Sequence, residues 1–219
     1  MIAKGDYFEM GADYAVGATR YLMHGLGGAN TFVKYDGDNV GIGYVSDAVI
    51  GGTVAAGTGT MELTRGWDIN AAFTHFWMPA LKSTLWGNYV ALDYSSQANA
   101  MLCSSIGFGN AGSGTAATAN AGCDFDWSAW AVGLRTEWAA TKNLSLGLEV
   151  LYADLNSMSI PGGVVTVVAN GAKPLAAYTV ADQSQVAVRF RVNRKRDMER
   201  YLAGNQRDEN VAPAARRKR

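Results

Sequence analysis

The segment Asp126–Asn156 contains two consecutive runs in which apolar and polar residues alternate, and a short polar turn joins the runs. Alternation with a period of two places successive side chains on opposite faces of a β-strand, whereas a helix would scatter them around its circumference. In the first run one face holds Ser128, Trp130, Val132, Leu134, Thr136 and Trp138, and the other holds Trp127, Ala129, Gly133, Arg135 and Glu137. In the second run one face holds Leu144, Leu146, Leu148, Val150 and Tyr152, and the other holds Ser145, Gly147, Glu149 and Ala153. The segment therefore predicts a β-hairpin with one apolar face and one polar face.

A hairpin of this kind suits two classes of β-protein. In a soluble sandwich the apolar face points to a core, whereas in a wide membrane barrel it meets lipid and the polar face lines a lumen. Each run is about ten residues long, which is the length that a tilted strand needs to cross a bilayer. Aromatic residues lie near both ends of the apolar face, at Trp130, Trp138 and Tyr152. The connection Ala139–Asn143 is short and the segments at the other end of the hairpin are long, an asymmetry that favours the barrel.

The same alternation predicts further strands. They are expected at Tyr7–Tyr14 and on toward Ala18, at Val40–Val45, Leu63–Trp77, Lys82–Tyr94 and Gln183–Asn193, which makes about seven strands in all. In Leu63–Trp77 the apolar face is assigned to Trp67, Ile69, Ala71, Phe73, His75 and Trp77, opposite Asp68, Asn70 and Thr74. In Lys82–Tyr94 it is assigned to Trp86, Val90, Leu92 and Tyr94, opposite Ser83, Gly87, Ala91 and Asp93. Pro79 marks a tight turn between these two strands. Loops are expected at 20–38, 49–61, 95–124 and 157–179, the last with a small hairpin arm at Val164–Val168.

The composition is consistent with one all-β domain. Of 219 residues 17% are charged, and there is no continuous apolar run of the roughly 18 residues that a spanning helix needs. The first residues contain no apolar stretch like that of a signal peptide. The net charge of zero hides an imbalance, because residues 1–193 hold 10 Lys and Arg against 15 Asp and Glu, and residues 194–219 hold 9 against 4. We therefore expect a barrel portion at 1–193 and a basic, disordered tail at 194–219, with a nucleic-acid-binding arm as the less favoured interpretation of the tail.

Residues that usually carry chemistry are few. Cys103 and Cys123 lie in one long loop, which predicts a loop-closing disulfide, with two unpaired thiols as the alternative. No further ligands lie at a spacing suited to zinc. His24 and His75 are isolated, and His75 shares its face with two tryptophans near a strand end, which favours an interfacial position over a catalytic base. The segment Gly107–Gly112 matches a dinucleotide-binding pattern, but its context lacks the required strand and helix. We predict no enzyme activity, no catalytic or metal site and no cofactor.

Charges on the polar faces are the candidate functional residues. A charge on the lipid face of a barrel costs about 2–4 kcal/mol near the bilayer midplane, so charged side chains are expected to face the lumen. The predicted pore-lining residues are Arg135, Arg189, Arg191, Glu137, Glu149, Asp68 and Asp93. Opposite charges across a lumen would create a transverse field that selects solutes by charge and dipole. The alternative is that these side chains are solvated wall residues with no selective role.

Four segments resemble a known family. They are GDYFEMGADYAVGATRY at 5–21, RGWDINAAFTHFWMPALKSTLWGNYVALDY at 65–94, CDFDWSAWAVGLRTEWAATKNLSLGLEVLYADL at 123–155 and QSQVAVRFRVNR at 183–194. They resemble the C-terminal half of the alphaproteobacterial porins, the general-diffusion porins of Brucella and relatives of Rhizobium. The resemblance implies part of a sixteen-stranded, homotrimeric barrel in the bacterial outer membrane, surrounded by lipid and lipopolysaccharide. Such a barrel would carry ions and small hydrophilic solutes.

The chain departs from that family in ways that predict a truncated product. The family's N-terminal half and its constriction loop have no counterpart here, the chain continues past its last predicted strand, and seven strands are too few for the family's barrel. The leading hypothesis for function is passive diffusion through a water-filled lumen. Two alternatives stay open at this point: a non-conducting outer-membrane β-protein or adhesin whose long loops bind a partner, and a soluble, secreted β-sandwich.

Overall fold

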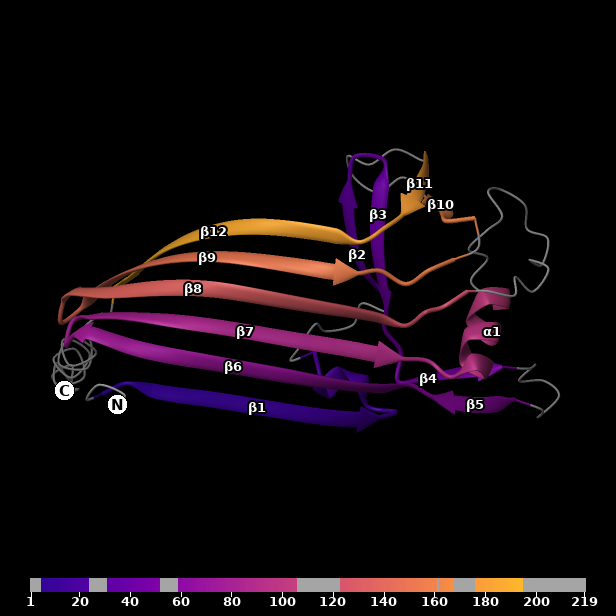
Figure 1. The fold of residues 1–219 in the computed structure, drawn as a ribbon, viewed down its shortest axis with the longest axis horizontal. Helices are drawn as coiled ribbons and strands as arrows, with labels where there is room; N and C mark the ends of the chain where they lie inside the picture. Colours follow the sequence, from indigo (N-terminus) through magenta and orange to yellow (C-terminus); the bar gives the residue numbers. More distant parts are fainter. Residues whose placement is uncertain are drawn as a thin grey trace, which may run out of the picture.

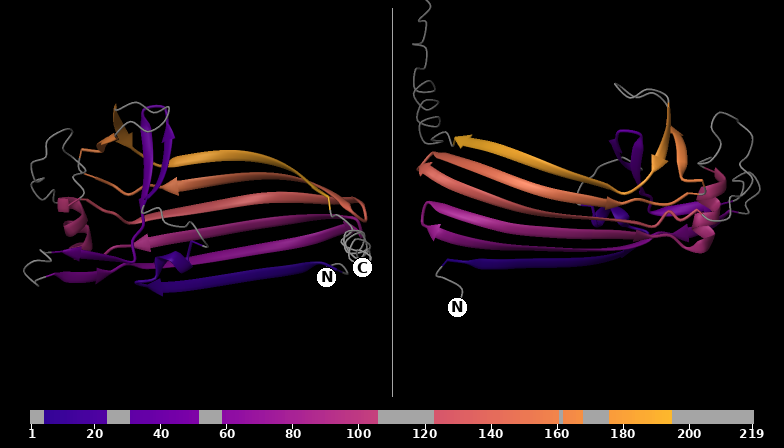
Figure 2. Two further views of the ribbon diagram at one scale, coloured as in Figure 1. Left: turned by 180° about the vertical axis from the view of Figure 1, so that it is seen from behind. Right: turned by 45° about the horizontal axis from the view of Figure 1, so that its top comes forward.

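Six long strands form one antiparallel sheet in the computed structural model (Figure 1). The structure describes residues 5–23, 31–51, 59–105, 123–160, 162–167 and 176–194. The strand order in the sheet is β1 (Tyr7–Val16), β6 (Arg65–Met78), β7 (Leu81–Asp93), β8 (Trp127–Thr141), β9 (Leu144–Asn156) and β12 (Gln183–Arg194). Figure 2 shows a single curved layer with β1 and β12 at its two edges. The prediction of an all-β, antiparallel fold of porin type, forming part of a barrel, is confirmed.

The two ends of this sheet differ. Short turns join β6 to β7 and β8 to β9 at one end, which we call the turn end. The long connections lie at the opposite end, the loop end, together with the smaller elements (Figure 1). This is the asymmetry between short turns and long loops that the sequence predicted.

Rows of paired residues run across all six strands and alternate in character. One row joins Phe8, Phe73, Leu85, Leu134, Val150 and Val188, and the next joins Tyr7, Thr74, Thr84, Arg135, Glu149 and Arg189. Because successive residues of a strand point to opposite sides, the first row belongs to one face of the sheet, the apolar face, and the second to the other, the polar face. The faces predicted for Asp126–Asn156 and for the strands at the two edges are confirmed.

The predicted faces of β7 are wrong. The register pairs Trp86 with Ala72 and Asp93 with Arg65, which places Trp86 on the polar face and Asp93 on the apolar face. The residues at every second position around Trp86 share its face and are polar: Lys82, Thr84 and Asn88. Their polarity already indicates that this is the polar face of β7. The apolar face of β7 is instead formed by large residues at odd positions, Leu81, Leu85 and Tyr89.

Segments predicted as loops contain short elements. The segment 20–38 includes part of η1 (Thr19–Tyr21) and β2 (Thr31–Asp36), and the segment 49–61 overlaps β4 (Ala48–Gly51) and β5 (Thr60–Leu63). The segment 95–124 begins with α1 (Ser96–Ser105), and 157–179 contains β10 (Val164–Val167) and most of β11 (Ala176–Val180). The predicted strand Val40–Val45 corresponds to β3 (Asn39–Tyr44), but it belongs to a second sheet of order β10-β11-β3-β2, not to the long sheet.

Buried hydrophobic residues gather at the loop end. Among the largest fully buried side chains are Phe125, Leu92, Met158, Val40 and Val165, and they belong to one cluster. In that region β3 contacts β8 and β9, and β2 contacts β12, so the smaller sheet packs against the loop end of the long one. Among the described residues no helix is long and apolar enough to cross a membrane.

Candidate functional site

Charged side chains form an ion-paired ladder across four neighbouring strands of the polar face, near the turn end. Lys82 Nζ lies 3.1 Å from Glu137 Oε2, and the same oxygen lies 3.9 Å from Arg135 Nε. On the next two strands Glu149 Oε2 lies 3.5 Å from Arg189 Nη1. Arg135 and Glu149 are direct cross-strand partners, so positive and negative groups alternate from β7 to β12. We call these five residues the charge ladder. It brings together four of the seven residues predicted to line a pore.

Trp86 anchors the middle of the charge ladder. Its Nε1 donates a hydrogen bond of 3.1 Å to Glu149 Oε1. Its ring lies against the backbone of Gly133, where an added Cβ would stand only 2.6 Å from ring atoms Cε2 and Cζ2. Glu149 is 8% exposed and is therefore fixed between the indole and Arg189. Alternation in the sequence does not predict Trp86 and Lys82 as members of this site, because the predicted faces of β7 are the reverse of the observed ones.

The electrostatics of the charge ladder leave positive charge accessible. Glu149 is mostly buried, whereas the side chain of its partner Arg189 is 58% exposed. Arg135 Nε is buried and donates no hydrogen bond to any residue that the structure describes, and Glu137 Oε2 lies 3.9 Å from it. Arg191 follows on the same face, opposite Gly147. The ladder therefore contains three cationic groups and two carboxylates. This excess of positive charge attracts an anion, or the negative end of a solute dipole, to the wall.

Two predicted pore residues lie apart from the charge ladder. Asp68 is on the polar face but toward the loop end, where it is 5% exposed and pairs across the strands with Asp13. Its Oδ1 accepts a hydrogen bond of 3.4 Å from Asn70 Nδ2. Asp93 is exposed on the apolar face beside Arg65, so the structure contradicts its assignment to the polar wall. The reason is the register of β7 described above.

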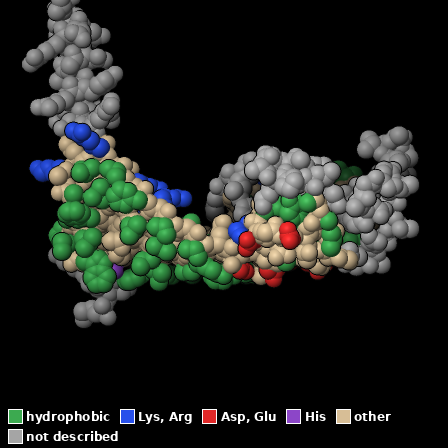
Figure 3. Space-filling view, turned by 90° about the horizontal axis from the view of Figure 1, so that it is seen from above, with side chains coloured by type: hydrophobic (Ala, Val, Ile, Leu, Met, Phe, Trp, Pro, Cys, Tyr) green, Lys and Arg blue, Asp and Glu red, His purple; other side chains and the backbone are tan. Residues whose placement is uncertain are grey.

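The apolar face is large and uncovered among the described residues. The side chains in its central row, named above, are between 36% and 67% exposed. Figure 3 shows hydrophobic side chains gathered over the long strands. At the turn end Trp77 is 63% exposed and Trp138 is 49% exposed, in the position of an interfacial aromatic girdle. A soluble sandwich would bury such a face, so this arrangement is that of a membrane wall.

Of the two histidines, the structure describes only His75. His75 lies near the turn end, with Nδ1 2.8 Å from Asp6 Oδ2 and its ring perpendicular to that of Trp77 at 4.4 Å. This is a structural contact at the strand end. His24 and the segment Gly107–Gly112 lie outside the described residues.

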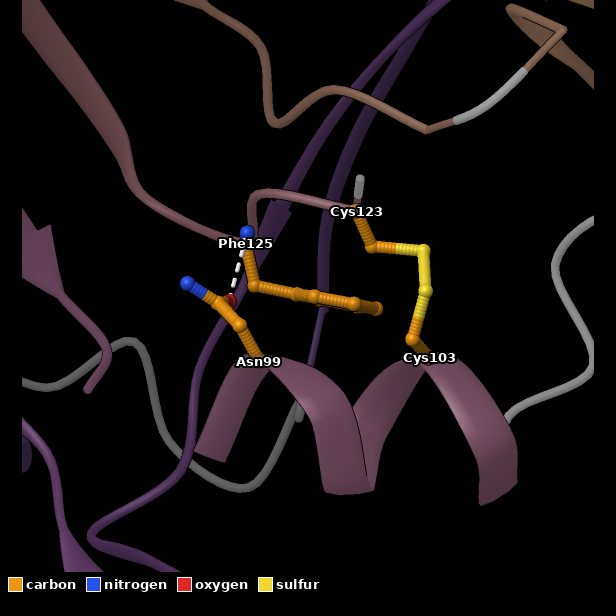
Figure 4. The surroundings of a disulfide bond; sticks show 4 residues. All are labelled: Asn99, Cys103, Cys123 and Phe125. Carbon is orange, nitrogen blue, oxygen red and sulfur yellow. Dashed lines mark hydrogen bonds between the residues drawn. A yellow bond between two sulfur atoms is a disulfide. The ribbon is translucent and has the colours of Figure 1, made fainter. Parts of the chain in front are cut away.

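A disulfide bond joins Cys103 of α1 to Cys123, with a Cα–Cα distance of 5.8 Å (Figure 4). Next to it Asn99 Oδ1 accepts a hydrogen bond of 2.9 Å from the backbone N–H of Phe125, whose ring is fully buried. The disulfide bond therefore holds Cys103 and Cys123, which flank the connection between α1 and β8, next to the hydrophobic core at the loop end.

Burial raises the pKa of ionisable groups at the loop end. Burial raises the pKa of Asp126, more than the 2.6 Å hydrogen bond from the Tyr94 N–H lowers it. Burial also raises the pKa of Tyr94, whose hydroxyl donates to the Tyr44 carbonyl at 2.7 Å. In the part of the chain that the structure describes, no group of three or more His, Cys, Asp and Glu residues could hold a metal ion.

An antiparallel sheet with an apolar outer face and a charged polar face defines a membrane β-protein of porin type. The family model described as the porin subfamily matches residues 1–189, so the chain belongs to the porin family. Membership makes it a porin-like channel protein of the bacterial outer membrane, a class defined by transport and not by catalysis. No curated protein and no solved structure matches the chain.

Proposed function

We propose that this chain forms part of the wall of a water-filled channel through which ions and small hydrophilic solutes diffuse passively. The charge ladder is the observation that carries the proposal. Its five residues come from four strands and all lie on one face, while the opposite face of the same strands is apolar. The ladder extends from the turn end to the middle of the strands, where Arg135, Glu149 and Arg189 lie. Charges near the middle of a spanning strand are stable beside water but cost about 2–4 kcal/mol each beside lipid.

The channel itself requires more strands than the described sheet contains. In the sheet β1 and β12 each have a neighbour on one side, so each offers an unpaired edge. We infer that further strands of a longer, normally sixteen-stranded barrel pair with these edges and that the chain is a truncated portion of a porin of the alphaproteobacterial type. By the same inference the complete barrel is a homotrimer surrounded by lipid and lipopolysaccharide. The basic tail predicted at 194–219 lies, except for Arg194, outside the described residues.

The ladder would act on solutes through its field. Arg135, Arg189 and Lys82 present accessible positive charge, while Glu137 and Glu149 are held by their partners. A fixed array of this kind orders water and favours anions without binding any one of them tightly. Replacement of an arginine by glutamate should therefore turn the preference of the channel toward cations.

Planar-bilayer recordings of the full chain test this proposal. Arg135→Glu and Arg189→Glu should each shift the reversal potential in a salt gradient toward that of a cation-selective pore. Lys142→Glu, in the turn between β8 and β9, makes the same charge change away from the ladder and should shift it much less. Unchanged reversal potentials in both arginine variants would refute the role of the ladder. Failure of the wild-type chain to produce discrete conductance steps would instead support the non-conducting alternative.

A further inference from the structure

A cavity of about 370 Å³ lies between the polar face and the elements folded over it at the loop end. Its floor includes three alanines of adjacent strands, Ala129, Ala131 and Ala153, whose small side chains leave the space open. Its other side is formed by Leu22 and Met23 and by β2. This volume falls in the range of sites that enclose small molecules, about 300–1,000 Å³.

The roof of the cavity presents a lysine toward the sheet. Lys34 of β2 lines the cavity and is the cross-strand partner of Gly41 in β3. Gly41 faces the long sheet, because an added Cβ there would lie 2.6 Å from Cγ of Gln183 in β12. Cross-strand partners share a face of their sheet, so the Lys34 side chain is directed toward the polar face as well.

The floor of the cavity presents a carboxylate on the opposite side. Asp68 lines the cavity, is 5% exposed, and its Oδ2 has no hydrogen-bond partner among the described residues. An unpaired buried carboxylate oxygen is costly, and Asp13 adds a second negative group in the adjacent strand. Neither Asp68 nor Lys34 forms an ion pair with any residue that the structure describes. Asp154 also lines the cavity, but its cross-strand partners Trp130 and Ser184 place its side chain on the apolar face. On the polar-face side the cavity thus holds one unneutralised carboxylate, Asp68, and its roof holds one unneutralised ammonium group, Lys34.

The rest of the lining indicates the remaining features of a ligand. Amide side chains of Asn70, Asn88 and Gln185 can donate and accept hydrogen bonds around the charged groups. Leu22, Met23 and Val90 provide an apolar wall in the same space. A ligand that satisfies all of these surfaces carries a cationic group, an anionic group and a short apolar side chain.

We propose that this cavity binds a free α-amino acid with an apolar side chain, with its ammonium group toward Asp68 and its carboxylate toward Lys34. This proposal rests on the proposed function, because the solute reaches the cavity through the water-filled channel. The amino acid would bind transiently in this cavity, on the loop-end side of the charge ladder, before it diffuses further through the lumen.

Three probes of one carbon skeleton test the proposal in equilibrium-binding measurements on the full chain in detergent micelles. They are L-leucine, 4-methylpentanoate, which lacks the ammonium group, and 3-methylbutylamine, which lacks the carboxylate. Each charge-assisted contact is worth on the order of a factor of ten in affinity, so both single-charge probes should bind about tenfold more weakly than leucine. Equal binding of all three probes, or no binding of leucine at millimolar concentration, would overturn the proposal.

Variants assign each charge to its wall. Asp68→Asn should weaken leucine binding by about tenfold and leave 4-methylpentanoate unaffected, and Lys34→Gln should weaken leucine binding similarly and leave 3-methylbutylamine unaffected. Asp93→Asn on the apolar face and Lys142→Gln in a turn make the same charge changes elsewhere and should change nothing. A merely structural role would weaken all three probes together, which would count against the assignment. If Asp68→Asn does not fold, Lys34→Gln on the overlying strand decides the outcome.

The binding assay separates this proposal from the proposed function, because binding in micelles does not require a conducting pore. Leucine binding by a protein that gives no conductance would refute the channel and leave the binding site standing. Conductance by a protein that binds none of the probes would do the reverse.

Discussion

The contact between Trp86 and Gly133 gives the sharpest test of how the charge ladder is held. In Gly133→Ala the new Cβ would lie 2.6 Å from ring carbons of Trp86, whereas carbon atoms normally approach to about 3.5–4.0 Å. The ring must therefore move by roughly 1 Å, and its 3.1 Å hydrogen bond to Glu149 is stretched or lost. Overpacking costs about 1–3 kcal/mol and a hydrogen bond to a charged group about 1.5–3 kcal/mol. The Gly→Ala gain from the unfolded chain, about 0.4–1 kcal/mol, offsets part of this, and water can replace part of the hydrogen bond. We expect a net loss of about 2 kcal/mol.

A matched substitution on the neighbouring strand should have the opposite sign. Gly147 also lies on the polar face, but a Cβ there would meet nothing closer than 3.8 Å. Gly147→Ala should therefore be neutral or stabilising by up to about 1 kcal/mol. Urea unfolding of both variants in the same micelles, followed by near-ultraviolet circular dichroism, measures the difference. In a Trp86→Leu background Gly133→Ala should lose most of its cost. A Gly133→Ala protein as stable as the wild type, with Trp86 present, would refute the packing argument.

Three further predictions concern the lipid face, the disulfide and a titrating carboxyl. Val188→Arg on the apolar face should reduce insertion into lipid vesicles by about 2–4 kcal/mol while its neighbour Ala187→Arg on the polar face should not, and equal insertion of the two variants would contradict the assignment of faces. Reduction of the Cys103–Cys123 bond, which spans a sequence separation of 20, should lower unfolding stability by about 3 kcal/mol in urea titrations under matched conditions, and no change in midpoint would argue against the cross-link in solution. The pKa of Asp126 is raised in the folded state, so its contribution to stability is present below the ordinary carboxyl pKa and is lost as pH rises through the folded-state pKa. The stability of Asp126→Asn relative to the wild type should therefore increase as pH rises across that range. A stability difference that does not depend on pH would contradict the shift.

The hairpin of β8 and β9 could be predicted residue by residue. Its face assignments depend on period-two alternation, which is local, and on a short turn that holds the register. The alternation survives without interruption from Ser128 to Trp138, so no competing assignment exists for that strand. The same argument explains why β1, β6 and β12 were also assigned correctly.

The faces of β7 could not be assigned by counting apolar residues. Both of its faces contain large side chains, with Trp86 on one and Leu85 and Tyr89 on the other. Trp86 is stable on the polar face because Gly133 leaves room for its ring and Glu149 accepts its N–H, and both residues are far away in sequence. An amphipathic aromatic residue can occupy either face of a membrane strand, so its partners decide its position.

Alternation predicted four of the five residues of the charge ladder, but not their order. Alternation places Arg135, Glu137, Glu149 and Arg189 on one face, and the registers of β8 with β9 and of β9 with β12 then determine which of them meet. Both short turns contain a register irregularity, between Phe76 and Met78 and between Ala139 and Thr141. A β-bulge adds one residue to one strand of a pair, so each turn resets which rows are opposite. Because a slip of one residue would move every side chain to the other face, the exposure of charge to lipid penalises every slip by an odd number of residues. Among the registers that remain, the short turns determine which residues are paired. The membrane therefore keeps the charges on one face, and the turns set their order along the wall.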